Sequence, residues 1–476
     1  MPNKYDVIVV GMGPSSIFCA YELIKLNKFK KVLLIDQGKR VEERYCPIEK
    51  TKKCIHCKPM CNITNGFSGA GAFSDGKLSL YNPEDDEIHV GGNIHKIIGV
   101  PETKRLIDYT DKIYLDFGAD KHLEGTEYKE EIAKINDRAH KEGIRLINIP
   151  IRHLGTEKSH EVYGRLEKYI EDNGVEMMFQ TTVADLIVEN GEIKGVRVKE
   201  AKYVDDEDRE TQEILADKVV LAVGRKGANW LVDMANKHNI ATETGIVDIG
   251  VRYELPDEIM KDVNKYMYEA KFTGRVGPFR DKVRTFCQNP SGFVSAEVYD
   301  NNLTLVNGHS YKERKSTNTN LAILVSHHFT SPFKRPIEYG RNVAQNLNDL
   351  GAGNIVVQRL GDIYRGKRTW DYELERNTVV PTLKSAVAGD ITFALGYRTM
   401  VSILEFIRAI DKIVEGFGAP DNLLYAPEIK FYSNKVVIDK QFETNIKGLY
   451  SIGDGGGMTR GLMMASCSGI QMARNL

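Results

Sequence analysis

The sequence predicts an α/β protein with a Rossmann-like dinucleotide-binding domain that is discontinuous along the chain, a helical insertion, and a mixed-sheet α+β second domain. Two glycine-rich segments at opposite ends of the 476 residues predict the first domain, one starting at Gly11 and the other at Gly448. Strand-like runs that alternate with turns from residue 246 to about 424 predict the second domain. A chain of this length also exceeds what one compact core accommodates.

The first glycine-rich segment predicts a site for a pyrophosphate. A β-branched strand at 7–10 runs into the turn 11–16, a helix extends to Lys28, and a second strand at 32–35 ends at Asp36. Gly11 permits the tight turn, and Gly13 leaves room for a pyrophosphate beside the helix N-terminus. Asp36 is placed to accept hydrogen bonds from an adenosine ribose. The residues expected to contact a dinucleotide here are Gly11, Gly13, Pro14, Ser15, Ser16, Asp36 and Gln37.

The later elements divide the chain into domains. A helix at 166–173, a hairpin with its turn at Asn190-Gly191, and an apolar strand that ends in Gly224-Arg225 follow the pattern of the first domain. Residues 82–149 are charged and amphipathic with helical spacing, which predicts a helical insertion or cap. The expected division assigns 1–81, 150–245 and 425–476 to the dinucleotide-binding domain, 82–149 to the insertion and 246–424 to the second domain.

This order of motifs resembles the FAD-dependent oxidoreductases of the glutathione-reductase superfamily. More narrowly, it resembles a bacterial and plastid family of NAD(P)/FAD-dependent dehydrogenases, over nearly the whole chain. The segments that carry the resemblance, beside the turn at Gly11, are 69–78, 151–156, 307–311, 358–362, 431–433 and 453–455. The resemblance implies an FAD flavoprotein that transfers hydride at flavin N5 to or from a small molecule, in a cleft between its domains. It implies no particular substrate.

The resemblance also distinguishes FAD from NAD. Enzymes of this superfamily return to the cofactor late in the chain and place an aspartate on its ribityl–pyrophosphate region, a role that falls here on Asp454. A glycine-rich loop at 69–76 is expected beside the flavin or pyrophosphate, where absent side chains allow close approach. Further expected FAD contacts are Gly69, Gly71, Lys77, Val183, Gly224, Arg225, Gly453, Asp454, Gly461 and Leu462. Only one dinucleotide fingerprint is seen, so electrons would come from transiently bound NAD(P)H, an electron-transfer protein or the substrate.

Four of the seven cysteines form a cluster with the spacing C-x7-C-x2-C-x3-C, at Cys46, Cys54, Cys57 and Cys61. Such spacing lets thiolates converge on one metal, either an iron–sulfur cluster or zinc, and a flavin neighbour favours the former. Redox-active thiols without metal and unliganded loop cysteines are the alternatives. A cluster that exchanges electrons leads to the alternative function, a flavin-containing electron-transfer protein or redox sensor.

Three residues are the catalytic candidates. Arg460 follows the Gly-Asp pair and is expected near the flavin pyrimidine, where a cation stabilises reduced flavin. His309 lies in a polar stretch typical of a substrate-facing wall. Arg398, or the pair Arg152-His153, is a candidate clamp for a substrate carboxylate.

Composition limits the partners. The chain has 65 basic and 66 acidic residues, so no electrostatic surface for nucleic acid is expected. No apolar run approaches the length of a transmembrane segment, and the first strand leaves no room for a signal peptide. We therefore expect a cytoplasmic protein with reduced or metal-bound cysteines and a small-molecule substrate.

Overall fold

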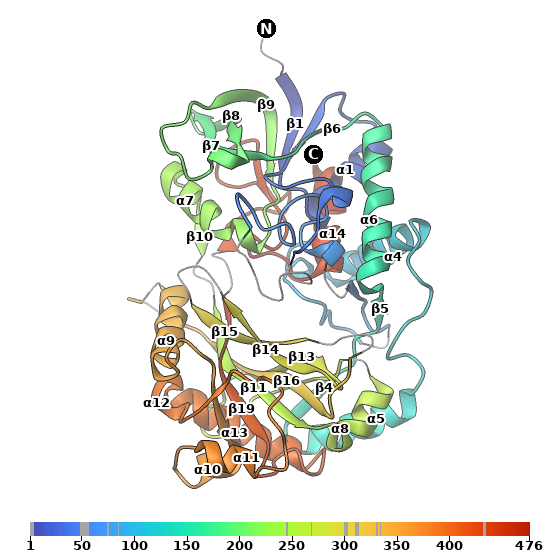
Figure 1. Cartoon of the computed structure of the whole chain (residues 1–476). Helices are drawn as coiled ribbons and strands as arrows, with labels where there is room; N and C mark the ends of the chain where they lie inside the picture. The colour runs from blue at the N-terminus through green and yellow to red at the C-terminus, as the bar shows by residue number, and fades with distance from the viewer. Residues whose placement is uncertain are drawn as a thin grey trace. The chain divides into compact units, whose positions relative to one another are not determined.

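The computed structural model describes residues 4–47, 57–73, 76–83, 85–243, 246–267, 269–298, 303–309, 314–329, 332–333, 335–431 and 435–476. The chain divides into two compact units (Figure 1). Unit 1 comprises Met1–Leu123, Pro150–Glu243 and Ser433–Leu476, and unit 2 comprises Glu124–Ile149 and Thr244–Tyr432. The segment 82–149, expected as one insertion, is thus divided between the units at Leu123.

Unit 1 is built on a mixed sheet with the strand order β6-β2-β1-β9-β8-β7, and β21 also pairs with β9. Strands β6, β2, β1, β9 and β21 are parallel, whereas β7, β8 and β9 form an antiparallel meander. The predicted α/β fold is confirmed. The strand bounds are β1 Lys4–Val10, β2 Val32–Ile35, β6 Glu176–Met178, β7 Thr181–Glu189, β8 Glu192–Glu200, β9 Gln212–Leu221 and β21 Leu449–Ser451.

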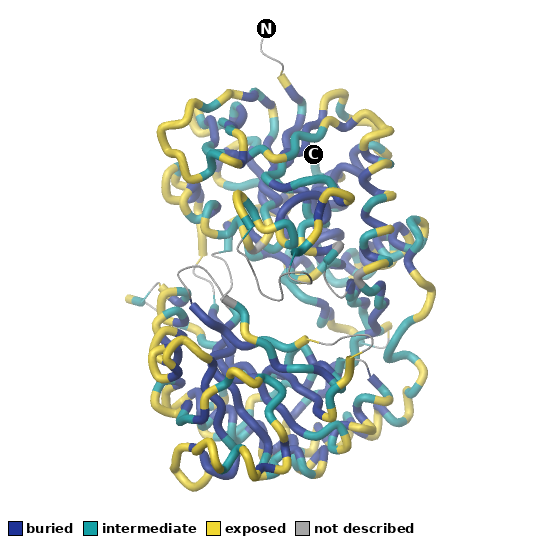
Figure 2. The backbone as a smooth tube through the Cα atoms, viewed as in Figure 1, coloured by how far each residue is buried: buried dark blue, intermediate teal, exposed yellow. Residues whose placement is uncertain are grey.

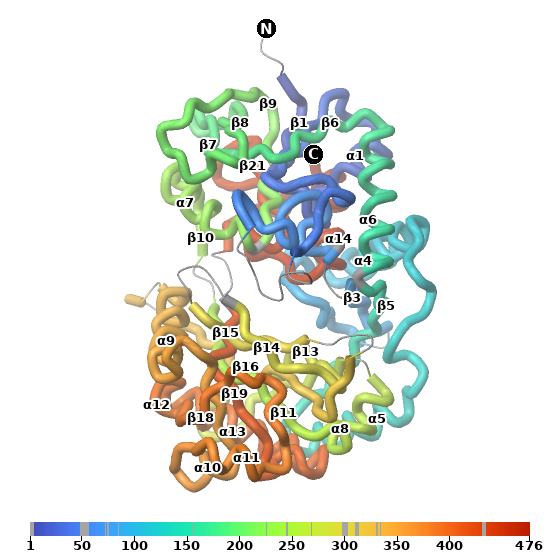
Figure 3. The backbone as a smooth tube through the Cα atoms, in the orientation of Figure 1, coloured from blue at the N-terminus to red at the C-terminus, as the bar shows by residue number. Residues whose placement is uncertain are grey.

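Helices α1 (Pro14–Leu26), α6 (Gly155–Asp172) and α14 (Leu462–Asn475) all begin at the same edge of this sheet. α1 and α14 follow the carboxyl ends of the parallel strands β1 and β21, and α6 leads back into the start of β6. Figure 3 shows the blue α1 and the red α14 side by side, although they come from opposite ends of the chain. A side chain at Gly469 of α14 would lie 2.0 Å from the Ser15 carbonyl oxygen, so these helices need a glycine where they meet.

Of two local predictions within unit 1, the structure confirms one and moves the boundary of the other. The hairpin turn at Asn190-Gly191 is confirmed, with both residues at positive φ between β7 and β8. The helix expected to begin at Leu166 begins at Gly155 instead. Its first turns are mostly polar, so the helical pattern around the buried Val162 and Tyr163 was not recognised in the sequence. Other elements of unit 1 are β3 Lys77–Ser79, β5 Ile151–His153, β10 Thr242–Glu243, β20 Lys435–Val436, α3 His95–Ile98, α4 Val100–Asp116 and α7 Ala228–His238.

Unit 2 is built on a sheet with the order β18-β17-β19-β11-β16-β13-β12-β4, antiparallel except for the pair β17–β18. One face, formed by alternate residues such as Val251 and Tyr253, packs on helices in an apolar core. The other face carries buried polar residues, among them Arg252 and Glu254. The strand bounds are β4 Ile144–Ile147, β11 Val247–Pro256, β12 Lys271–Gly274, β13 Val283–Asn289, β16 Asn318–His327, β17 Val356–Arg359, β18 Val387–Ala388 and β19 Leu423–Phe431.

A two-stranded hairpin of β14 (Phe293–Val298) and β15 (Thr304–His309) packs beside this sheet. The central strands β11 and β16 are buried along almost their whole length (Figure 2). The helices of unit 2 are α5 Lys129–Lys141, α8 Asp257–Tyr266, α9 Pro336–Leu350, α10 Leu360–Tyr364, α11 Asp371–Glu375, α12 Thr392–Leu395 and α13 Tyr397–Asp411. Among the described residues, no helix has the length and apolar character needed to cross a bilayer.

Candidate functional site

The two glycines of the first turn have different roles in the structure. Gly11 has a φ of +101°, and a side chain there would lie 2.7 Å from the Ala222 carbonyl oxygen at the end of β9. Gly13, the N-cap of α1, has an ordinary φ of −78°, and a side chain there would meet nothing within 4 Å. Gly11 is therefore required by the fold, whereas Gly13 leaves open space in front of the first turn of α1.

Asp36 connects three loops at this turn. Its carboxylate accepts the backbone N–H groups of Met12 at 2.9 Å, of Gly38 at 2.8 Å and of Gly66 at 2.8 Å. A carboxylate has lone pairs for about four hydrogen bonds, so these contacts leave capacity for a ribose hydroxyl. The neighbouring Gln37 donates to Asn65 at 2.5 Å. The predicted ribose ligand thus also has a structural function.

The glycine-rich loop reaches the start of α1. The Ser68 N–H donates to the Met12 carbonyl at 2.8 Å, and a side chain at Gly69 would lie 3.4 Å from the Gly13 Cα. Further along, a side chain at Gly71 would come within 3.0 Å of the Tyr163 ring on α6. The glycine-rich loop therefore lies against the first turn in unit 1, and its expected position beside the flavin or pyrophosphate stays a prediction.

Arg44, which is not among the predicted site residues, holds this loop in place. Its guanidinium is buried and donates to the carbonyls of Asn62 and Ile63 at 2.7 and 2.8 Å and to the Ser68 hydroxyl at 2.9 Å. Burial lowers the pKa of Arg44 to about 10. No motif marks this arginine, because its partners are mostly backbone carbonyls, which the sequence does not distinguish.

The C-terminal glycine-rich segment meets the first one. Gly453 has a φ of +76°, and a side chain there would lie 2.8 Å from the Ser15 hydroxyl. Asp454 accepts the Thr459 hydroxyl at 2.8 Å and the Gly461 N–H at 3.4 Å, which folds the loop that precedes Leu462 and α14. A side chain at Gly461 would also meet nothing within 4 Å. Open space therefore lies beside Gly13 at the start of α1 and beside Gly461 at the start of α14.

The other predicted cofactor residues are more scattered. Lys77 lies in β3, opposite His153 in β5. Val183 is buried in β7 as part of the core of unit 1. Gly224 follows β9 and faces open space, and the Arg225 side chain lies outside the described residues.

The catalytic candidates lie in both units. In unit 1, the Arg460 N–H donates to the Gly91 carbonyl at 3.3 Å, next to an isolated bridge between Gly92 and Thr459. In unit 2, His309 at the end of β15 has its Nδ1 2.7 Å from the Ser295 hydroxyl.

Arg398 and Arg152 are both engaged by carboxylates of the protein. Arg398 of α13 forms two hydrogen bonds, at 2.8 and 2.6 Å, to Asp281, and these bonds lower the pKa of that aspartate. Arg152 is buried and binds both oxygens of Asp111 at 2.7 Å. The Arg152 guanidinium is therefore already bound to a carboxylate of the protein, and the expected clamp of Arg152 and His153 stays a prediction.

The cysteine cluster is described only in part, because Cys54 lies outside the described residues. Cys46, Cys57 and Cys61 are free thiols. The Cys61 carbonyl accepts the Asn65 side-chain amide at 3.0 Å, and Asn65 in turn binds Gln37, next to Asp36. Within the described part of the chain, no group of three or more His, Cys, Asp or Glu residues has the arrangement of a metal site. The shared metal site stays a prediction.

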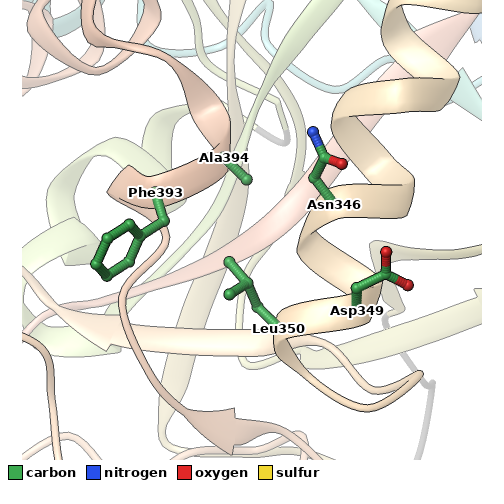
Figure 4. A pocket seen from close by; sticks show the side chains of 5 residues that line it. All are labelled: Asn346, Asp349, Leu350, Phe393 and Ala394. Carbon is green, nitrogen blue, oxygen red and sulfur yellow. The ribbon is translucent and has the colours of Figure 1, made fainter.

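A pocket of about 410 Å³ lies between α9 and α12 of unit 2 (Figure 4). Asn346, Asp349 and Leu350 line one side, and Phe393 and Ala394 line the other. Asp349 accepts a hydrogen bond from Gln345 at 2.8 Å, and Phe393 is 80% exposed. No predicted site residue lies in this pocket.

Comparison with known proteins relates the chain to flavoproteins. Residues 137–247 match the family described as FAD binding domain, and residues 247–430 match the family described as FAD-dependent protein, C-terminal domain-like. A Clostridium beijerinckii protein that carries no functional name is 25% identical over 496 aligned positions, which cover 99% of this chain and 81% of that protein.

Two solved structures are similar at low identity. The quinol fumarate reductase of E. coli is 12% identical, with a TM-score of 0.42 and coverage of 99% of this chain and 69% of that one. The L-proline dehydrogenase of P. horikoshii is 11% identical, with a TM-score of 0.38 and coverage of 100% and 93%. The two adjoining family matches confirm the resemblance seen in the sequence, and the chain is an FAD-dependent oxidoreductase with a Rossmann-like FAD-binding domain.

Proposed function

We propose that unit 1 binds FAD across the starts of α1 and α14 and that the protein oxidises or reduces a small molecule at the flavin. The observation that carries this proposal is that Gly69 and Gly453 approach the start of α1, at Gly13 and Ser15, where Gly13 itself leaves open space. The helix N-termini offer unpaired N–H groups and partial positive charge to a pyrophosphate. When bound, FAD supplies hydride transfer at N5.

The residues of the chain have the following roles in this proposal. Gly13 and Gly69 keep side chains out of the path of the pyrophosphate, beside Ser15 and Ser16. Asp36, held by the backbone of Met12, faces the adenosine ribose. Other FAD contacts are proposed from the sequence alone: Pro14, Gln37, Gly71, Val183, Gly224 and Arg225. Gly11 is proposed to shape the turn that holds the cofactor.

At the other end of the site, Asp454, Gly461 and Leu462 receive the ribityl and ring portion. Arg460 supplies a positive charge near the pyrimidine. His309 and Arg398 remain proposed catalytic residues, although Arg398 already binds Asp281.

The test of this site is a single substitution with a matched control. Gly13→Val introduces a side chain into open space with a compatible φ, so the protein should fold but lose nearly all bound FAD. Gly164→Val is the control, because Gly164 on α6 also has no neighbour within 4 Å, and it should retain FAD. FAD released per chain is measured on purified protein, together with the thermal unfolding midpoint. A folded Gly13→Val protein with stoichiometric FAD would contradict the proposal.

We also propose, on the sequence spacing, that Cys46, Cys54, Cys57 and Cys61 share an iron–sulfur cluster or zinc. NAD(P)H or an electron-transfer protein is the proposed electron source. The contact chain from Cys61 through Asn65 to Gln37 locates one of these cysteines near Asp36, which is the adenosine end of the proposed site. Anaerobic purification with metal analysis tests the cysteine site, and anaerobic bleaching of the flavin by NADH or NADPH tests the donor.

A further inference from the structure

The short antiparallel ribbon of β3 and β5 brings together two segments that are about 75 residues apart in the sequence. Its register places Lys77 opposite His153, Leu78 opposite Arg152, and Ser79 opposite Ile151. Residues directly opposite in an antiparallel pair present their side chains on the same face, with Cβ atoms about 5 Å apart. Lys77 and His153 are therefore neighbours on one face of the ribbon.

Arg152 is directed away from that face. It and Leu78 form the other face, and both are buried. The Arg152 guanidinium binds Asp111 of α4 through two hydrogen bonds of 2.7 Å. Because neighbouring residues of a strand alternate between faces, His153 points away from Asp111. The ribbon thus separates Lys77 and His153, both half-buried, from the ion pair beneath them.

The position of this pair is fixed by close packing on α6. Gly76, directly before Lys77, has a φ of +64°, and a side chain there would lie 2.2 Å from the Ser159 hydroxyl and 2.8 Å from the Leu154 Cβ. The Leu154 N–H donates to the Gly76 carbonyl at 3.1 Å. Lys77 and His153 are therefore held at the first turn of α6.

The same edge of unit 1 carries the start of α14. The Tyr114 hydroxyl contacts the Ser466 hydroxyl of α14 at 2.9 Å and the Tyr163 hydroxyl of α6 at 3.0 Å. Ser466 lies about one turn from the start of α14, and Tyr163 about two turns from the start of α6. Strand β3 itself packs against α14. Lys77 and His153 are thus near the helix start where Gly461 and Leu462 are proposed to receive the flavin end of FAD.

We infer that Lys77 and His153 form the binding site for a carboxylate group of the small-molecule substrate in unit 1. An ammonium group with three N–H donors beside an imidazole N–H provides charge-assisted hydrogen bonds of the kind that carboxylates accept. The inference rests on the proposed FAD site, and it moves Lys77 from the cofactor contacts to the substrate contacts.

The experiment follows the His153 ring by NMR while succinate is added to the purified holoprotein. The Cε1–H resonance is assigned with a His153→Asn variant. Succinate should shift this resonance saturably, whereas its uncharged diamide should not. Lys77→Met should weaken the succinate affinity at least tenfold, which corresponds to about 1.4 kcal/mol. Lys77→Arg, which keeps the charge, should restore most of the affinity and serves if the methionine variant folds poorly.

Lys158→Met is the matched control. Lys158 lies in the first turns of α6 and pairs with Glu161 at 3.0 Å, so its loss removes the same charge from the same helix end. It should change the succinate affinity less than twofold. An unresponsive His153 resonance, or equal succinate affinity in Lys77→Met and wild type, would overturn the inference. So would loss of FAD from Lys77→Met with unchanged succinate binding, which would return Lys77 to the cofactor. FAD released from the wild type tests the proposed function separately, since the succinate titration reads a histidine and not the flavin.

Discussion

Gly13 in unit 1 and Gly308 in unit 2 lack a side chain for opposite reasons. A side chain at Gly13 would meet nothing within 4 Å, whereas one at Gly308 would lie 1.9 Å from Arg252 Nη2 and 2.2 Å from Asn320 Oδ1. The first glycine preserves a space, and the second allows strand β15 to lie directly on a buried guanidinium. Both belong to segments that resemble the same family. The comparison teaches that a glycine motif marks a ligand site only where the structure leaves room beside it.

The largest expected effect comes from removing the buried charge under Gly308. Arg252 is fully buried; it donates to Asn320 at 2.8 Å and to the Cys287 carbonyl at 2.9 Å, and it lies 3.4 Å from Glu428. Arg252→Met leaves the buried Glu428 with Lys430 at 3.1 Å, and we expect a loss of about 3–5 kcal/mol in the free energy of unfolding.

Urea denaturation measures this loss. Arg335→Met removes an arginine from an exposed pair with Glu338 and should cost under about 0.5 kcal/mol. Equal losses of unfolding free energy in both variants would show that the buried Arg252 stabilises the fold no more than an exposed arginine does.

A smaller effect is expected at the glycine itself. Gly308→Ala forces a methyl group against Arg252 and Asn320, and the strand must shift, so we expect a loss of about 2 kcal/mol in the free energy of unfolding. Gly164→Ala, in open space on α6, should instead be neutral or stabilising, because alanine favours helix. The same urea titration compares them. An unchanged free energy of unfolding in Gly308→Ala would show that Gly308, like Gly13, has room for a side chain.

The smallest effect concerns an exposed ion pair of unit 2. Hydrogen bonding to Arg398 lowers the pKa of Asp281, so the unfolded chain binds more protons between the two pKa values. The pair therefore stabilises the fold above the unfolded pKa of about 4, and this contribution is lost as the pH falls through the folded value. Because Arg398 is 60% exposed, Arg398→Gln should cost under about 1 kcal/mol at pH 7.

The measurement is the unfolding free energy of Arg398→Gln and wild type across pH. The two curves should converge as the pH falls below about 4. If the difference in unfolding free energy between Arg398→Gln and wild type stayed constant down to pH 2, the ion pair of Arg398 with Asp281 would not be its cause. Arg398 would then have to stabilise unit 2 through packing, for example through its contact with the Phe279 ring.

The sequence predicted best those features that depend on residues close together along the chain. The strand–turn–helix–strand that ends at Asp36 and the Asn190-Gly191 turn depend on local periodicity and on residues that tolerate positive φ, and both are present. The contact between Gly453 and Ser15 was not predicted, since no local rule connects residues so far apart; only the late return of the chain to the cofactor, at Asp454, was expected, and that from a resemblance.

The missed features depend on contacts between distant segments. The ribbon of β3 and β5 has strands too short for a periodic pattern, so neither the pairing of Lys77 with His153 nor the ion pair of Arg152 with Asp111 could be predicted. Arg252 lies in the strand 247–256, where a buried arginine looks like an exposed one until the neighbouring strands are known. Arg44 binds mostly backbone carbonyls, which every residue possesses.

The close packing of α14 on α1 has a consequence for synthesis of the protein. Strand β21 and helix α14 complete unit 1, and the last of their residues is Asn475. During translation, the first strands and α1 emerge long before α14, so the face of α1 that packs on α14 has no partner until α14 has emerged. The strands described for unit 2 have all been synthesised once residue 431 has emerged. Because domains fold as units during synthesis, unit 2 can finish folding on the ribosome first, and the FAD-binding unit is completed last.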